Sequence, residues 1–312
     1  MPQRPTSPPF SARRSAFAAS LAVCLTCCAA PAPWVAIPFT CTTADNLVVH
    51  ATLNGRDPVD LMFHTAIDSV SLTKAAIARL TTFASDGSID VRSWGGTTSA
   101  RHSRGNTLQI GPLTWRDLEL TESELSGPGS DGKFGPNLFA GRVVELDFDR
   151  GELRLHEALP PHAAQFQQLE LEEHNGMLFV VGEVVVGERT ARTSFLLHTG
   201  FGGAALIDEQ FVREQGLPTE PDPIAQTLQD SYGNPVRTQR LQRTSLRLGN
   251  LVFDDVPAAV FPGQLGDRRT SVLGGAVLTR MDLILSADRR QLYVRSNARY
   301  AARWPAPSQR PS

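Results

Sequence analysis

Two short stretches of the sequence decide the fold: LMFHTA at residues 61–66 and FLLHTG at residues 195–200. In each stretch, three apolar residues typical of a buried strand lead directly into a His-Thr turn. The two histidines, His64 and His198, lie 134 residues apart. The chain is therefore expected to contain two similar halves, each of which carries one such turn.

The sequence that follows each turn repeats at nearly the same spacing. Residues 108–118 match residues 246–256 at an offset of 138, with apolar residues on apolar residues and glycine on glycine. Further matches at an offset of 139 join residues 134–135 to 273–274 and residues 153–155 to 292–294. Because the offset drifts by only a few residues, the repeat predicts two lobes of similar structure.

The hydrophobic pattern within each half is mainly that of β-strands. Four segments alternate or run apolar over strand-like lengths: Asn46–Leu53, Val143–Leu155, Met177–Val186 and Asp282–Val294. Gly and Asn pairs such as Asn54-Gly55 and Gly249-Asn250 separate them, as expected of turns between strands. Only residues 72–80 and 208–216, each just after a His-Thr turn, have a helical pattern. We expect an all-β protein with a few short helices.

Composition and charge narrow the possible functions. The chain has 312 residues, of which 41% are hydrophobic and 20% charged, as is usual for a globular protein with sizeable cores. The formal net charge is −2, and no dense run of Lys and Arg occurs. Phosphate binding needs a concentrated basic surface, so nucleic acid is excluded as a partner.

Residues 1–32 are expected to be an export signal. Arg13 and Arg14 precede an apolar run of roughly 15 residues, which suits a signal peptide and is short for a membrane span. Cleavage would leave Cys41 as the only cysteine, and thus no internal disulfide. We expect a periplasmic or extracellular protein with no membrane span after signal removal. Twin-arginine export and a lipid anchor near residues 25–28 are the alternatives.

On these motifs the chain resembles the retropepsin-like aspartic peptidases, present as two tandem lobes as in the pepsin-like enzymes. The resemblance covers residues 35–297 and implies a bilobal acid-protease fold, with two closed β-barrel lobes related by pseudo-twofold symmetry. It implies a flap hairpin in each lobe, here at Trp94–Gly96 and Tyr232–Asn234. It also implies an apolar segment that crosses behind each turn, here Lys133–Gly135 and Val272–Gly274.

The resemblance also divides the chain. It gives an N-terminal lobe at residues 35–156, a linker at residues 157–168, a C-terminal lobe at residues 169–297 and a tail at residues 298–312. The linker contains Pro160-Pro161 and several polar residues, as expected between lobes. Because one chain supplies both lobes, we expect a monomer.

His64 and His198 stand where the family has its two catalytic aspartates. Two adjacent carboxylates share a proton and activate water, and imidazoles cannot reproduce that chemistry. The resemblance gives Thr65 and Thr199 a structural role, bonding across the lobe interface, and Gly200 keeps the permissive backbone of the turn. Ala66 departs from the family, which has glycine there.

The sequence leaves the activity open. The resemblance implies an endopeptidase, whereas the histidines predict loss of the standard mechanism and a relic site. The alternatives are a peptide-binding or envelope-protein-binding module, with Trp94 and Tyr232 as ligand contacts, and a hydrolase based on histidine or a metal. No cofactor or metal is predicted, because a third metal ligand would have to come from residues without diagnostic spacing, namely His50, Asp68, His102 or Asp131.

Overall fold

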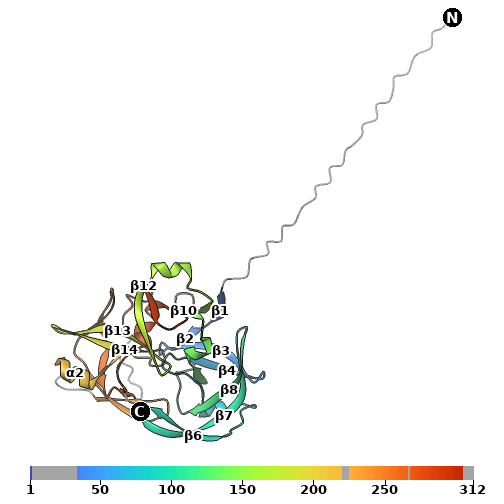
Figure 1. Cartoon of the computed structure of the whole chain (residues 1–312), viewed down its shortest axis with the longest axis horizontal. Helices are drawn as coiled ribbons and strands as arrows, with labels where there is room; N and C mark the ends of the chain where they lie inside the picture. The colour runs from blue at the N-terminus through green and yellow to red at the C-terminus, as the bar shows by residue number, and fades with distance from the viewer. Residues whose placement is uncertain (2–33, 220–224, 266–267, 305–312) are drawn as a thin grey trace. The chain divides into compact units, whose positions relative to one another are not determined.

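The strand-like segments of the sequence form strands, and these pair into two lobes joined by a shared sheet (Figure 1). The computed structural model describes Met1 and residues 34–219, 225–265 and 268–304. Residues 2–32 of the predicted leader and residues 305–312 of the predicted tail lie outside the described residues. Both lobes and the shared sheet belong to one unit, Pro33–Ser312.

The first lobe is a closed barrel with two extra strands. Its strands are β2 Thr40–Cys41, β3 Leu47–Leu53, β4 Asp57–Phe63, β5 Val70–Thr73, β6 Gly87–Ser93, β7 Gly96–Ile110, β8 Leu113–Ser123 and β9 Gly132–Phe134. The barrel runs in the order β3, β4, β9, β5, β8 and β7, and β7 pairs again with β3. Closure leaves few open edges, and β6 extends the sheet as one arm of a long hairpin with β7.

The second lobe repeats this order with two of its strands interrupted. Its strands are β13 Met177–Val186, β14 Arg189–His198, β15 Ala205–Asp208, β16 Ala225–Gln229, β17 Pro235–Arg240, β18 Thr244–Leu248, β19 Leu251–Val256, β20 Ala258–Phe261, β21 Gln264–Leu265, β22 Arg268–Arg269 and β23 Ser271–Gly274. The counterpart of β8 is divided at Pro257, which has no N–H to donate to a strand neighbour, into β19 and β20. The counterpart of β7 is divided into β17 and β18.

A six-stranded sheet joins the lobes. It consists of β1 Trp34–Pro38, β10 Val143–Asp147, β11 Glu152–His156, β12 Gln167–His174, β24 Met281–Leu285 and β25 Gln291–Ser296. The order is β1, β11, β10, β24, β25 and β12, so β10 of the first half pairs directly with β24 of the second. The predicted linker contains the 3₁₀ helix η2 Pro161–Gln165 and the start of β12.

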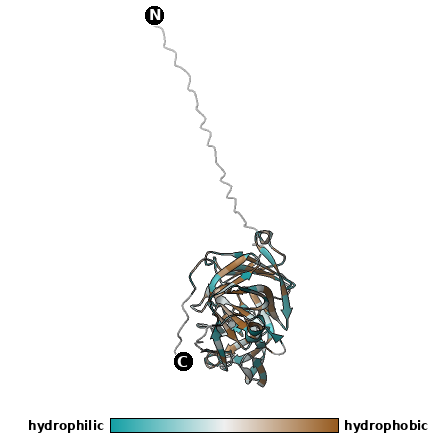
Figure 2. Ribbon diagram, turned by 90° about the vertical axis from the view of Figure 1, so that its left-hand side faces the viewer, coloured by the Kyte–Doolittle hydropathy of each residue, from teal (hydrophilic) through white to brown (hydrophobic). Residues whose placement is uncertain are grey.

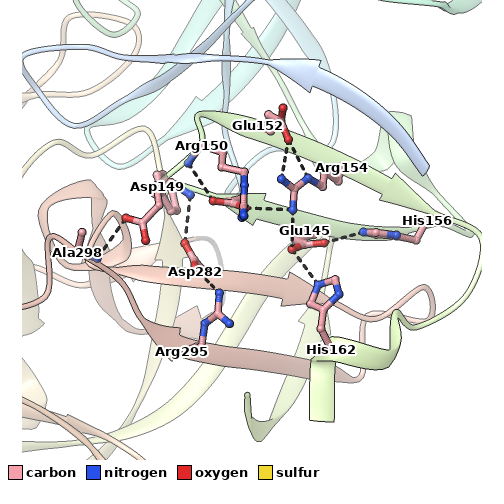
Figure 3. Close-up of polar contacts among 12 residues, drawn as sticks. Glu145, Asp149, Arg150, Glu152, Arg154, His156, His162, Asp282, Arg295 and Ala298 are labelled. Carbon is pink, nitrogen blue, oxygen red and sulfur yellow. Dashed lines mark hydrogen bonds and ion pairs between the residues drawn. The ribbon is translucent and has the colours of Figure 1, made fainter. Parts of the chain in front are cut away.

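Buried charge lies on this shared sheet (Figure 3). Glu145 accepts a hydrogen bond from His156 at 2.7 Å and another from His162 at 3.0 Å, and it also pairs with Arg154. Burial opposes ionisation of Glu145, but these partners outweigh it and hold the pKa of the carboxyl below its ordinary value. The cluster therefore ties the linker helix η2, which carries His162, to the sheet.

The apolar residues concentrate on the interior strands of the unit (Figure 2). Behind the first His-Thr turn, the rings of Phe63, Phe134 and Phe139 contact one another with centroids 5.4 to 6.1 Å apart. All three side chains are almost fully buried. Aromatic contacts of this kind add to the burial of apolar surface, so they fix the end of β4 from which the turn emerges.

The helices are short, and two of them lie within the predicted segments. They are α1 Lys74–Ile77, α2 Glu209–Gln215, α3 Gly275–Leu278 and the 3₁₀ helix η1 Pro136–Phe139. Thr73 caps α1 and Asp208 caps α2, each by accepting a hydrogen bond from a backbone N–H of the first turn. The sequence pattern did not predict α3, which is a single buried turn after β23.

Candidate functional site

The two His-Thr turns are joined by a reciprocal set of hydrogen bonds. Thr65 Oγ1 donates to the carbonyl of Leu197 at 2.6 Å, and Thr199 Oγ1 donates to the carbonyl of Phe63 at 2.6 Å. Each hydroxyl also accepts from the other threonine's backbone N–H, at 3.1 and 3.2 Å. All of these bonds are buried, so the turns form one rigid element between the lobes, in the arrangement that the family resemblance implies.

The crossing segments hold each turn from behind. β9 pairs in parallel with β4, and β23 pairs in parallel with β14, so each turn emerges between two strands. The glycines that end these segments leave no room for a side chain. A Cβ on Gly135 would come within 2.1 Å of the Ile67 carbonyl oxygen, and one on Gly274 within 2.1 Å of the Gly203 carbonyl oxygen. Only glycine permits this close approach of backbones.

The imidazoles of His64 and His198 face each other across the interface. Their ring centroids are 4.5 Å apart and the rings are tilted by 60°. Nδ1 of His64 accepts a hydrogen bond from the Ala66 N–H at 3.1 Å, so the neutral ring carries its proton on Nε2. Among the described residues, Nδ1 of His198 is buried and has no hydrogen-bond partner. The pair therefore combines one oriented ring with one that has an unused nitrogen.

Gly200 is what allows His64 to take this position. A Cβ on Gly200 would come within 2.1 Å of Cδ2 of His64. The corresponding Ala66 of the first turn instead packs against an apolar cluster of the second lobe that includes Phe261 and Val272. The two turns are thus alike in sequence but differ in what lies against their third residue.

Both imidazoles are held in the neutral form. Burial, the neighbouring His198 and the charge of Lys133 together lower the pKa of His64 well below its ordinary value. Burial and Lys133 lower the pKa of His198 to about 4. Two neutral imidazoles can donate or accept hydrogen bonds, but at neutral pH they supply neither the negative charge nor the shared proton of two carboxyls.

Lys133 is the third ionisable group of the site. It lies on β9, paired with Met62 of β4, and its side chain is buried. Its Nζ donates a hydrogen bond to Ser231 Oγ, which belongs to the opposite lobe. Burial lowers the pKa of Lys133 to about 8 against the opposing attraction of Asp230. From the sequence, Lys133 was predicted only to belong to a crossing segment. The sequence signal that could have identified Lys133 is the difference between the two copies, because the second copy has Val272 at this position.

Two hairpins contact each other next to Lys133. We call β6–β7, with its tip at Trp94-Gly95, the first flap hairpin, and β16–β17, with its tip at Ser231–Asn234, the second flap hairpin. Gly95 N donates to Asp230 Oδ2 at 2.9 Å, so the two tips contact each other. The ring centroids of Trp94 and Phe261 are 5.1 Å apart, and the rings are arranged edge to face. The side chain of His64 is only 4% exposed.

We refer to His64, His198, Lys133, Ser231 and Trp94 as the inter-lobe site. Tyr232, the other predicted ligand contact, is partly buried in the second tip, and burial raises the pKa of its hydroxyl. Trp94 and Tyr232 are therefore both at the tips where the sequence predicted them, and Trp94 packs on the opposite lobe. The roles of Asp230, Ser231 and Phe261 were missed, because each depends on contacts between lobes.

The residues considered as further metal ligands are scattered. His50 pairs with Asp60 at 3.0 Å on the exposed surface, beside a cavity of about 680 Å³. Asp131 pairs with Arg79. His102 is buried, and neither of its ring nitrogens has a hydrogen-bond partner among the described residues. Within the described part of the chain, no group of three or more His, Cys, Asp or Glu side chains is placed to hold a metal ion.

Comparison with known proteins agrees with this geometry. A family model described as aspartyl protease matches residues 49–138 and 182–277, and each region contains one His-Thr turn and one crossing segment. The solved structure of an aspartic proteinase from Irpex lacteus is similar, with a TM-score of 0.57 at 12% sequence identity. That match covers 87% of this chain and 100% of the other. No curated protein matches the sequence. The predicted all-β, two-lobed fold is confirmed.

Proposed function

Because the chain belongs to the aspartyl protease family and has imidazoles where its resemblance to that family places carboxylates, we propose that it does not cleave peptides by the two-carboxylate mechanism. We propose that it instead binds an extended peptide at the inter-lobe site, between the flap hairpins. The observation that carries this proposal is the pair of facing imidazoles, 4.5 Å apart, on turns that are otherwise fully built.

The charges at the site oppose the standard chemistry. In the two-carboxylate mechanism, one ionised and one protonated acid act together on a water molecule. Here His64 already uses Nδ1 to accept the Ala66 N–H, and both rings are neutral at neutral pH. The adjacent charge is the positive one of Lys133, which opposes protonation of either ring. The site is therefore poorly suited to transfer protons in the manner of an acid pair.

The same elements suit the binding of a strand. β6 and β16 of the two flap hairpins lie at the ends of their sheets, and an extended peptide can hydrogen-bond to such edges while its side chains fill alternate pockets. An apolar cluster of the second lobe lies next to the turns and includes Phe179, Phe261 and Val272, with Trp94 against it. A ligand would have to displace the Trp94 ring from Phe261, so Trp94 is expected to contact it.

A proteolysis assay tests the first half of the proposal. We expect the purified protein not to cleave unfolded casein at pH 3 to 7. Cleavage that pepstatin inhibits would overturn the proposal. The double variant His64→Asp, His198→Asp is the companion, because the threonine bonds and crossing segments that support the turns are unchanged in it. Activity gained only in the double variant would show that the fold remains competent.

A binding assay tests the second half. Peptides selected for binding should lose about 1 to 3 kcal/mol of affinity when Trp94 is replaced by alanine, as for an interface anchor. Trp34→Ala is the matched control, because Trp34 lies on β1 of the shared sheet and is 37% exposed. If the wild type and the Trp94 variant bind the peptides with equal affinity, Trp94 of the first flap hairpin does not contact the ligand.

We also propose that the protein is exported and acts as a monomer in the periplasm or outside the cell. Support comes from the sequence of residues 1–32, and from a single chain that contributes both flap hairpins. No helix of the described residues is long and apolar enough to cross a membrane. N-terminal sequencing and mass spectrometry of the mature protein test cleavage and lipidation, and light scattering tests the oligomeric state.

A further inference from the structure

Lys133 is where the two copies of the crossing segment differ most in chemistry. The second lobe has Val272 at this position, 1% exposed, whereas Lys133 is 3% exposed. The internal repeat thus shows that the position suits an apolar side chain. Removing an ammonium group from water costs several kcal/mol unless a partner replaces the lost hydration. The partners of Lys133 therefore indicate what this position is for.

The described residues give Lys133 only a neutral partner. Its Nζ donates to the hydroxyl of Ser231, and within the described part of the chain no carboxylate is bonded to it directly. Asp230 is the carboxylate whose charge acts on it. That carboxylate accepts from the backbone N–H groups of Gly95, Tyr232 and Asn234 at 2.9 Å, and from the Asn234 side chain at 3.1 Å. The buried ammonium therefore lacks a direct counter-charge.

The two imidazoles next to Lys133 supply no negative charge either. His64 with its proton on Nε2 offers a donor, and His198 has a buried nitrogen without a partner in the described structure. The site therefore combines a buried ammonium with two neutral imidazoles, and the carboxylate of Asp230 bonds to the hairpin backbone. A carboxylate would gain a charge-assisted hydrogen bond from such a group of side chains.

We propose that the peptide bound at the inter-lobe site carries a carboxylate, which replaces Ser231 Oγ as the partner of Lys133. The inference rests on the proposed peptide binding and names its ligand class. The apolar cluster with Phe179, Phe261 and Val272 lies on the second-lobe side of the same turns. The favoured peptide therefore has apolar residues next to its acidic group.

Exchange of partners couples binding to opening of the second flap hairpin. The Ser231 carbonyl accepts from the backbone N–H groups of Glu124 and Leu125, both at 2.9 Å, and this holds the tip on the first lobe. When the tip lifts, Lys133 loses its hydroxyl partner. A ligand carboxylate restores a partner at that moment, so acidic peptides stabilise the open form more than neutral ones do.

Four versions of one N-acetylated, unlabelled apolar heptapeptide test the inference by isothermal titration calorimetry. They combine a central Glu or Gln with a free or amidated C-terminus, and so separate a side-chain carboxylate from a terminal one. At pH 6.5 and low salt, we expect either the Glu peptide to bind at least tenfold more tightly than the Gln peptide, or the free C-terminus to bind at least tenfold more tightly than the amidated one. Lys133→Met should reduce this preference to less than twofold while neutral peptides still bind. Lys74→Met is the control, because Lys74 is the chain's other lysine and is exposed.

The outcomes separate the inference from the proposed function. Binding of all four peptides with equal affinity would overturn the carboxylate preference and leave peptide binding intact, whereas binding of none would overturn both. If the Lys133 variant does not fold, the pH dependence of peptide binding to the wild type gives a second test. The preference should fall as the pH is raised from 6.5 to 9.5, because Lys133 loses its charge near pH 8. A preference that is constant over this range would contradict the role of Lys133.

Discussion

Replacing Thr199 with valine probes the bonds that hold the two His-Thr turns together. Valine keeps the shape of threonine but has no hydroxyl. The Phe63 carbonyl would lose a donor at 2.6 Å, and the Thr65 N–H would lose an acceptor at 3.1 Å. Both groups belong to buried residues, 0% and 3% exposed, so water cannot replace the lost partners without rearrangement.

The expected destabilisation follows from these two groups. A buried donor or acceptor left without a partner costs about 1 to 3 kcal/mol, so Thr199→Val should lower the free energy of unfolding by about 4 kcal/mol. For a protein of this size, that corresponds to a fall in Tm of roughly 8 to 16 °C. Thr199→Ser keeps the hydroxyl and removes one methyl group, so it should cost only about 1 kcal/mol.

Urea unfolding followed by tryptophan fluorescence, with calorimetry for Tm, measures the difference between these variants. If the free energies of unfolding of Thr199→Val and Thr199→Ser lie within about 1 kcal/mol of each other, the hydroxyl contributes little and the bonds do not hold the turns together. The double variant Thr65→Val, Thr199→Val adds a further check. Since each hydroxyl accepts a hydrogen bond from the backbone N–H of the other threonine, the two positions are coupled, and the destabilisation of the double variant should differ from the sum of the single variants.

Three other changes test the site and the shared sheet. Gly200→Ala places a Cβ within 2.1 Å of Cδ2 of His64, so calorimetry should show about 1 to 3 kcal/mol of destabilisation; an unchanged Tm would contradict the observed ring position. His198 titrates near pH 6.5 when unfolded but near pH 4 when folded. Its contribution to stability is therefore fully present above pH 6.5 and falls between pH 6.5 and 4, by up to about 1.4 kcal/mol per unit. His198→Leu should flatten this part of a urea-derived stability profile, and an equally steep profile would count against it. Glu145→Gln should cost about 1 to 3 kcal/mol at pH 7, because His156 and Arg154 lose a charged buried partner, although Arg154 keeps Asp147 and Glu152. The folded pKa of Glu145 is lowered, so this cost should shrink as the pH falls below 4.5, and a cost independent of pH would argue against an ionised Glu145.

The sequence predicted the hairpins and crossing segments that form the inter-lobe site, but not the contacts that their side chains make between the lobes. Trp94 and Tyr232 lie at hairpin tips as expected, and the segments at Lys133 and Val272 cross behind the turns. These features depend on short-range signals: alternating apolar residues, glycine-containing turns and a repeat that shows them twice. The third helix, α3, was missed because one buried turn of helix has no period long enough to recognise.

The two all-β lobes, each with a His-Thr turn, could be predicted from the sequence, because strand periodicity and turn residues act locally and the repeat shows every signal twice. The 4.5 Å between the ring centroids of His64 and His198, and the contact of Lys133 with Ser231 of the opposite lobe, could be seen only in the folded chain. The two histidines are 134 positions apart in the sequence, and Lys133 and Ser231 are 98 apart. These contacts arise when strands of different lobes pack together, which buries Lys133 and keeps both imidazoles neutral. The charge at the site is thus set by burial, and burial is a property of the folded chain.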